Sequence, residues 1–244
     1  MVKALEQHLY TMDMNEDGVQ DEIENPYLFE FTLLAKPEIN AFALPGGQIF
    51  MTEALYRALA PGSNDRIDPN TNQTRTQRDL LHLFNARIAG VLGHEIGHVV
   101  ERHGSEQMAK GNLIQGIVGA AGVGGGGRGG SQAAAYVGNL INLKYGRNDE
   151  LESDRWGIET MILAGYHPRH LLDVMEVLKA SGSGGTPEFM SSHPSSETRI
   201  AKIKELIQER QVLVDQMLED NQRRNILGSS GGQENRQAPR FEFN

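Results

Sequence analysis

The chain has 244 residues, of which 39% are apolar and 23% charged, as is usual for a globular protein with a core of its own. Its net charge of −9 argues against a nucleic-acid partner, because it leaves no excess of basic residues to neutralise phosphates. The absence of cysteine excludes a thiolate nucleophile and a Cys-ligated zinc site.

Short elements are predicted for the first third of the chain, where apolar runs are brief and Gly, Pro, Asn and Asp are frequent. The expected elements are a helix over 2–12, a strand over 27–34, a hairpin-like pair over 39–44 and 48–52, a helix over 53–59, and a polar loop without core residues over 61–74.

Amphipathic helices dominate the remainder, and the longest is predicted over 80–108, where apolar residues recur at i, i+3, i+4 and i+7. Further helices are expected over 132–144 and 148–164, from 167 onward and over 195–227, with a Gly-rich loop over 116–131 and a disordered tail over 228–244. Residues 1–227 are therefore interpreted as a single domain.

The long apolar helix contains an H-E-x-x-H motif formed by His94, Glu95 and His98. Two histidines four residues apart lie on one helical face, where both imidazoles can bind one metal ion. Neutral imidazole suits zinc, and Glu95 on the adjacent turn is the candidate general base. His103 lies off the face of the two histidines and is predicted to be an exposed or helix-end residue rather than a ligand.

The later helix carries the candidate for the third zinc ligand, since a catalytic zinc ion usually has three protein ligands. Glu150 and Asp154 are four residues apart and share a face, whereas Glu152 points elsewhere. Glu150 can bind the metal while Asp154 accepts the free N–H of a metal-bound histidine. Taken alone, the segment also suits a solvated helix start, where carboxylates are favoured by the helix dipole.

Four segments, taken in order, resemble metallopeptidase family 48. They are NAFALPGG at 40–47, the H-E-x-x-H helix, the R-x-x-E-x-E-x-D helix and SHPSSETRI at 192–200. This gluzincin family includes CAAX prenyl endopeptidases and bacterial membrane-quality-control proteases. The resemblance covers roughly 27–207 and is greatest to soluble periplasmic members that act in outer-membrane assembly and quality control. One departure is Ser153, where many members carry alanine.

The resemblance implies an α+β fold, namely a mostly helical zincin-like domain with a small sheet beside the active-site helix. It also implies that Glu150 is a zinc ligand with Asp154 behind it. His193 is implied to face the zinc site, either stabilising the oxyanion or occupying the open position in a latent state, with Arg199 as a second donor. Residues 40–45 resemble the family's edge strand, to which an extended substrate can add as another strand.

A second metal signal lies at 13–24, which fits the calcium-loop pattern D-x-[DN]-x-[DN]-G-x5-E. The candidate Ca²⁺ ligands are Asp13, Asn15, Asp17, the carbonyl of Val19, Asp21 and Glu24. Gln20 at the eighth position and the nearby Pro26 disfavour a paired EF-hand, so a single loop is expected. An acidic solvated turn is the alternative, and the family does not generally contain this loop.

The function expected from these features is zinc-dependent hydrolysis of unfolded or misassembled polypeptides. No apolar run reaches the length of a membrane span, and the first residues lack the apolar core of a signal peptide. We expect an extracytoplasmic, periplasmic protein whose leader is absent from this chain, with peripheral contacts to the membrane or to outer-membrane assembly.

Two other functions compete with the protease. One is a latent or non-catalytic chaperone or adaptor that retains the zinc site, against which Glu95 argues, because an adaptor has no need of a general base. The other is an extracytoplasmic calcium-binding module with an incidental zinc site.

Overall fold

The computed structural model of the chain describes residues 27–110, 144–181, 188–193 and 197–230. Several predicted segments lie outside the described residues: the helix over 2–12, the calcium loop over 13–24, the Gly-rich loop over 116–131, all but the last residue of the helix over 132–144, and the tail from 231 onward.

A three-stranded mixed sheet forms the first part of the fold. Its strands are β1 (Glu30–Leu34), β2 (Ala41–Ala43) and β3 (Gln48–Thr52), in the spatial order β1-β3-β2. The predicted hairpin is the antiparallel pair of β2 and β3, whereas β1 pairs with β3 in parallel. The hairpin turn requires glycine, because Gly46 and Gly47 have φ angles of 109° and 104°.

The polar segment after the sheet is fastened to the core by one ion pair. Helix α2 (Glu53–Ala58) leads into a short 3₁₀ turn, η1 (Ser63–Arg66). Asp65 in this turn accepts two hydrogen bonds, of 2.6 and 3.0 Å, from the buried guanidinium of Arg87. The loop contributes no apolar core residue, in agreement with the sequence, but its carboxylate neutralises a buried charge.

The central element is α3 (Gln77–Val100), which begins at the N-cap Thr76, whose side chain accepts a hydrogen bond from the backbone N–H of Asp79. The sequence predicted one helix over 80–108, and this was wrong in its second half. The helix ends at Val100, Arg102 adopts a left-handed conformation with φ of 59°, and residues 103–110 form a new helical segment. The reversal occurs without glycine, so no composition signal marked it.

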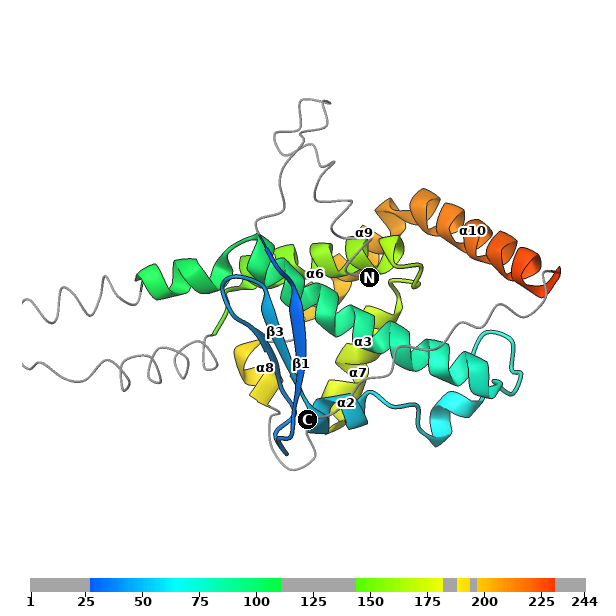
Figure 1. The fold of residues 1–244 in the computed structure, drawn as a ribbon, viewed down its shortest axis with the longest axis horizontal. Helices are drawn as coiled ribbons and strands as arrows, with labels where there is room; N and C mark the ends of the chain where they lie inside the picture. The colour runs from blue at the N-terminus through cyan, green and yellow to red at the C-terminus, as the bar shows by residue number, and fades with distance from the viewer. Residues whose placement is uncertain (1–26, 111–143, 182–187, 194–196, 231–244) are drawn as a thin grey trace, which may run out of the picture.

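Helix α6 (Arg147–Leu163) packs directly on α3, and glycines allow the two backbones to approach closely (Figure 1). A Cβ atom added at Gly97 of α3 would lie only 2.7 Å from the Cα of Ser153 in α6. Gly157 of α6 faces α3 in the same way, since a Cβ atom added there would lie 3.4 Å from the backbone nitrogen of His94. These contacts fix how far apart the two motif-bearing helices lie.

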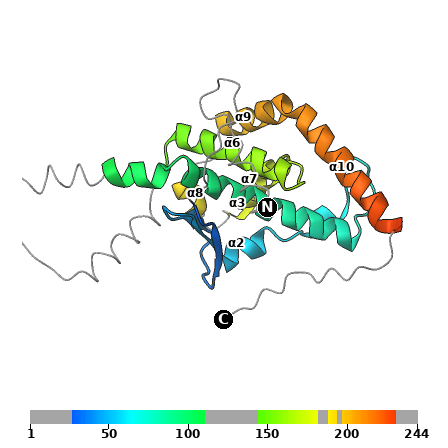
Figure 2. The same cartoon turned by 45° about the horizontal axis from the view of Figure 1, so that its top comes forward.

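The remaining helices cover this pair. They are α7 (His170–Ser181), α8 (Glu188–Ser192), α9 (Glu197–Glu209) and α10 (Gln211–Ser230). The sequence predicted one helix over 195–227, but the structure divides it at Arg210, and α10 leaves α9 at an angle (Figure 2). Arg210 donates a 2.5 Å hydrogen bond to Glu159 of α6, which anchors this corner.

Short helix α8 is held to the sheet by its backbone. The N–H of Phe189 donates to the carbonyl of Ile39, just before β2, at 3.1 Å. At its other end the carbonyl of Ser192 accepts from the N–H of Tyr145 at 3.1 Å. Residue His193 directly follows this helix, so these two bonds determine where its side chain lies.

Helix α3 separates two layers. One side packs against the sheet with α2 and α8, and the other packs against α6 with α9 and α10 beyond it (Figures 1 and 2). The predicted fold class, a mostly helical α+β domain with a small sheet beside the motif helix, is confirmed. Within the described ranges, no helix combines the length and apolar character that a membrane span requires.

Candidate metal centre

Four side chains from three parts of the fold converge at the middle of the molecule. His94 and His98 come from α3, Glu150 from the first turn of α6, and His193 from the end of α8. All four are buried, with at most 2% of each residue exposed. They are the one cluster of this kind that the described residues contain.

The spacing of the four donor atoms fits a tetrahedral ion. The Nε2 atoms of His94 and His98 are 3.1 Å apart, and the Nδ1 of His193 lies 3.3 and 3.2 Å from them. The Oε1 of Glu150 lies 2.9 Å from His193 Nδ1 and 3.4 Å from His98 Nε2. Four donors at zinc-like distances of about 2.0–2.1 Å from one ion would be about 3.3–3.4 Å apart. The residues therefore fit a zinc ion.

The first histidine is oriented by a carboxylate and a guanidinium. His94 Nδ1 lies 3.0 Å from Oδ1 of Asp154, which is fully buried. Arg199 donates to Asp154 through Nε at 2.5 Å and through a terminal nitrogen at 2.7 Å, and it also contacts Glu150. Burial alone would raise the pKa of Asp154, but the charge of Arg199 holds it below the ordinary value. Asp154 is therefore an ionised acceptor for the N–H of His94.

The second histidine is oriented by residues that the sequence reasoning missed. His98 Nδ1 lies 3.0 Å from Nδ1 of His103, and His103 Nε2 lies 2.9 Å from a carboxylate oxygen of Glu152. His103 is 4% exposed, so it is not an exposed residue, but it does lie at a helix end, as the first residue of the segment after α3, and it is not one of the four donors, as the sequence predicted. The left-handed turn at Arg102 folds it back onto His98, and helical periodicity could not reveal this. A signal existed in the acidic residue Glu152, which was assigned to no role.

The carboxylate of Glu95 lies beside the four donors with its oxygens free of hydrogen bonds, as a general base requires. Its side chain is fully buried beside the cluster, and neither carboxylate oxygen has a hydrogen-bond partner. Its Oε1 lies 3.5 Å from His193 Nε2. Burial raises the pKa of the Glu95 carboxyl, although nearby positive groups act against this. A buried carboxylate without a hydrogen-bond partner lowers the stability of the fold. Such a group therefore calls for an explanation, and a catalytic role is one.

The fourth donor, His193, has electrostatic partners on two sides. Burial alone would lower the pKa of its imidazole, but Glu150 and Glu95 raise it above the ordinary value. Burial would likewise raise the pKa of Glu150, yet His193, His98 and Arg199 hold it well below its usual range. The carboxylate of Glu150 is thus ionised although it is buried, and metal binding requires a deprotonated ligand.

The edge strand lies beside the cluster. Asn40 and Leu44 hydrogen-bond to β3, so the backbone groups of the alternate residues Ala41 and Ala43 point the other way. Among the described residues, none hydrogen-bonds to Ala41 or Ala43 from that side. Ala41 is 0% exposed and Ala43 5%, so this edge is covered in the structure, and an additional extended chain can pair with it only after the covering residues move away.

The structure places the sequence-predicted residues in two groups. His94, Glu95, His98, Glu150, Asp154, His193 and Arg199 meet in one buried cluster. Arg199 donates hydrogen bonds to Asp154 and also contacts Glu150, so its guanidinium is engaged by these two carboxylates. The predicted Ca²⁺ ligands at 13–24 lie outside the described residues.

Comparisons with known proteins agree with this site. Residues 12–207 match the model of peptidase family M48. The beta-barrel assembly-enhancing protease of Escherichia coli is 28% identical over 236 residues, which cover 88% of this chain and 42% of that protein. The mitochondrial metalloendopeptidase OMA1 of Schizosaccharomyces pombe is 30% identical over 189 residues, covering 75% of this chain and 48% of the relative.

A third relative, the metalloprotease YcaL of Escherichia coli, is 30% identical over 138 residues and matches 54% of each chain. The chain spans less than half the length of the two relatives named before it. The family match nevertheless covers most of this chain, including every residue of the central cluster. The chain therefore belongs to peptidase family M48, a family of metallopeptidases.

Proposed function

We propose that this chain is a zinc-dependent endopeptidase that hydrolyses unfolded or extended polypeptides. The observation that carries the proposal is the clustering of His94, His98, Glu150 and His193 next to Glu95, whose carboxylate has no hydrogen-bond partner. A structural zinc site needs no such base. Five of the six donor pairs lie 2.9–3.4 Å apart, as ligands of one ion would, and His94 Nε2 lies 3.6 Å from the other carboxylate oxygen of Glu150.

The chemistry divides between the ion and the chain. Zinc, when bound, lowers the pKa of water and polarises the scissile carbonyl. Glu95 accepts the proton of the attacking water and passes it to the leaving amine, which its buried, unpaired carboxylate is free to do. His193, displaced from the fourth position, would donate to the developing oxyanion from the same side as Glu95.

Arg199 has a positioning role in this proposal. It was expected near the oxyanion, but its guanidinium is engaged by Asp154 and Glu150. Through Asp154 it fixes the ring of His94, and through Glu150 it fixes the anionic ligand. It thus maintains the site without touching the substrate.

The described arrangement supports a closed, latent form. Catalytic zinc sites keep one position open, whereas sites with four protein ligands are structural. His193 supplies the fourth donor here, and the cluster is at most 2% exposed. Activity therefore requires His193 to move away, and the short helix α8 that carries it is the part of the site that can do so.

The proposed substrates follow from the edge strand. Ala41 and Ala43 offer unpaired backbone groups, which recognise an extended chain of almost any sequence. The name of the beta-barrel assembly-enhancing protease connects that relative with β-barrel assembly, and we extend the expected periplasmic location and role in outer-membrane quality control to this chain as part of the proposal. Contacts with the outer-membrane assembly machinery are part of the same proposal.

The test is cleavage of an unfolded reporter protein by the zinc-loaded chain, compared with Glu95→Gln and with Glu176→Gln, an exposed residue, as the matched control. His193→Ala tests the closed form. We expect Glu95→Gln to bind zinc but to lose cleavage, the control to retain it, and His193→Ala to bind zinc less tightly.

Two outcomes would contradict the proposal. A chain that binds no zinc has no metal centre of the proposed kind. A chain that binds zinc but does not cleave the unfolded reporter would favour the non-catalytic chaperone or adaptor.

A further inference from the structure

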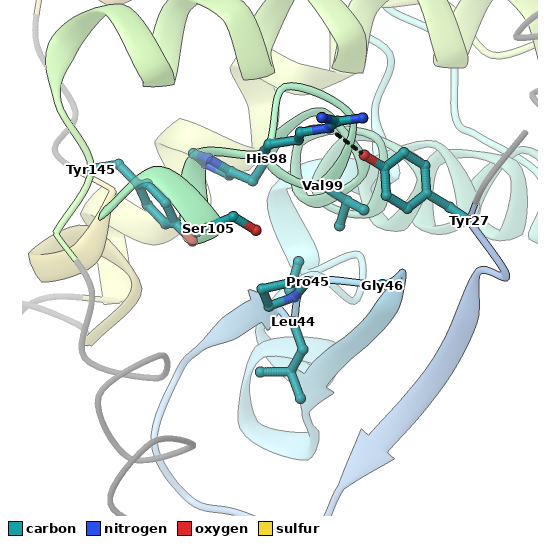
Figure 3. Close-up of a pocket in the computed structure, with 11 residues that line it drawn as sticks. Tyr27, Leu44, Pro45, Gly46, His98, Val99, Ser105 and Tyr145 are labelled. Atoms are coloured by element: carbon teal, nitrogen blue, oxygen red, sulfur yellow. Dashed lines mark hydrogen bonds between the residues drawn. The ribbon is translucent and has the colours of Figure 1, made fainter. Parts of the chain in front are cut away.

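A cavity of about 380 Å³ opens between the β2–β3 turn and the end of α3 (Figure 3). Leu44, Pro45 and Gly46 of the turn form one wall. The opposite wall comes from the end of α3 and the segment after it. Its volume is in the range of sites that enclose a small ligand or a large side chain.

The cavity borders the metal centre. His98, a candidate ligand, lies on its wall, and the ring of Tyr145 stacks on that of His98 with centroids 3.8 Å apart. Tyr145 also stacks near His193, at 5.1 Å. A group in the cavity would therefore lie one side chain away from the reacting atoms, with the hydroxyl end of Tyr145 beside it (Figure 3).

The cavity also borders the edge strand. Ala43, whose backbone groups point away from β3, is one of its lining residues, and Leu44 follows directly. A peptide that adds to β2 runs past the opening, and its alternate side chains point to the same face. One of these side chains is then directed at the cavity, close to the scissile bond.

The lining selects by size and charge. The lining is mostly apolar and includes Pro45, Val99 and the rings of Tyr27 and Tyr145, and none of the eleven lining residues is acidic. Arg102, an exposed cation that donates a 3.4 Å hydrogen bond to Tyr27, stands at the opening. A lysine or arginine of the substrate would meet a like charge there and find no carboxylate.

We propose that this cavity is the subsite for the substrate side chain next to the scissile bond, and that it takes a large uncharged side chain such as Leu, Met or Phe. This inference rests on the proposed peptidase function. It adds a specificity element to backbone recognition by β2, so that exposed apolar residues, which mark an unfolded chain, direct cleavage.

Gly104 offers a way to fill the cavity without disturbing the fold. It is buried in the helical segment after α3, and a Cβ atom there would meet Pro45 Cγ at 3.8 Å and Tyr145 Oη at 3.9 Å, which are ordinary contacts. Alanine therefore fits, whereas leucine extends into the cavity. Gly62, where an added Cβ meets nothing within 4 Å, provides the control variant Gly62→Leu.

The experiment maps cleavage sites in an unfolded reporter protein by mass spectrometry for the zinc-loaded wild type, Gly104→Leu and Gly62→Leu. We expect large apolar residues at one position flanking the cut in the wild type and Gly62→Leu. In Gly104→Leu the ratio of cleavage at large to small residues should fall by about tenfold or more. An unchanged ratio in Gly104→Leu, or no apolar preference in the wild type, would overturn the subsite.

A binding measurement keeps this test separate from that of catalysis. Two short peptides that differ only in Phe or Gly at one position are titrated into zinc-loaded Glu95→Gln and into the same protein with Gly104→Leu. The Phe peptide should bind about tenfold tighter to the first protein only. If the wild type does not cleave, the proposed function fails while this result still decides the subsite. Equal binding of both peptides to Glu95→Gln would refute the subsite.

Discussion

The close approach of α3 and α6 at Gly97 predicts that Gly97→Ala damages metal binding more than stability. The new Cβ would lie 2.7 Å from Ser153 Cα and 2.9 Å from Trp156 Cβ, where carbon atoms normally stay about 3.5–4.0 Å apart. The helices must therefore separate by roughly 1 Å. Such overpacking costs about 1–3 kcal/mol, and the better helix propensity of alanine returns up to about 1 kcal/mol. With the full gain subtracted, the net loss is about 0–2 kcal/mol.

The same displacement acts on the metal centre more strongly. Glu150 belongs to α6 and both histidine ligands to α3, so a shift of roughly 1 Å far exceeds the ±0.2 Å that metal–ligand distances tolerate. Zinc affinity should fall by about 10–100-fold. The assays are chelator competition for zinc and urea unfolding of the metal-free chain.

The matched control for this prediction is Gly90→Ala in the same helix. Its added Cβ would meet Leu171 and Met161 side-chain atoms at 3.4 and 3.5 Å, which can adjust. We expect its zinc affinity to match the wild type. Equal affinity in Gly97→Ala, or an equal loss in Gly90→Ala, would refute the argument from helix spacing.

Three further perturbations test other parts of the structure. Arg199→Gln should lower the free energy of unfolding by about 3–5 kcal/mol in urea titrations, because Asp154 stays buried without its counter-charge; a loss below about 1 kcal/mol would contradict this. Glu152→Gln should weaken zinc binding by about tenfold in chelator competition, since it removes the charge that orients His103, and unchanged affinity would exclude that role. Burial and neighbouring positive charges lower the pKa of His167 to about 4, so the folded chain loses stability as pH falls from about 6.5 towards 4. His167→Asn should therefore gain stability relative to the wild type at pH 5 but not at pH 7 in thermal unfolding, and a pH-independent difference would contradict the assignment.

Local periodicity explains what the sequence could predict. Spacing of four residues predicted that His94 and His98 share one face, and that Glu150 and Asp154 share another. Their meeting across two helices was predicted from the need of a catalytic zinc ion for a third ligand and from the family resemblance, because spacing within each helix says nothing about how the helices pack. The glycines at the contact were visible in the sequence, but only the structure shows what they face.

The misread elements have physical reasons. The turn at Arg102 and the corner at Arg210 interrupt amphipathic patterns without Gly or Pro, and each is held by long-range contacts, in the second case to Glu159. The amphipathic spacing of apolar residues continues through both points, so it predicted one helix in each case. The burial of His103 was not predicted for the same reason, since a single left-handed residue reverses the direction in which a side chain points.

The hydrogen bond between Phe189 of α8 and Ile39, just before β2, occupies a carbonyl oxygen that a bound peptide could also use. Ile39 alternates with Ala41 and Ala43, so its carbonyl lies on the same open side of the strand, and the N–H of Phe189 occupies it at 3.1 Å. A peptide that pairs along this side as far as Ile39 must displace that N–H. The carbonyl of Phe189 accepts from the N–H of His193 at 2.8 Å, so the displaced segment is the one that carries the fourth metal donor. A polypeptide that pairs along β2 would thus displace the segment that carries His193 and open the metal site. A folded protein has no free strand to pair in this way, so the site would stay closed.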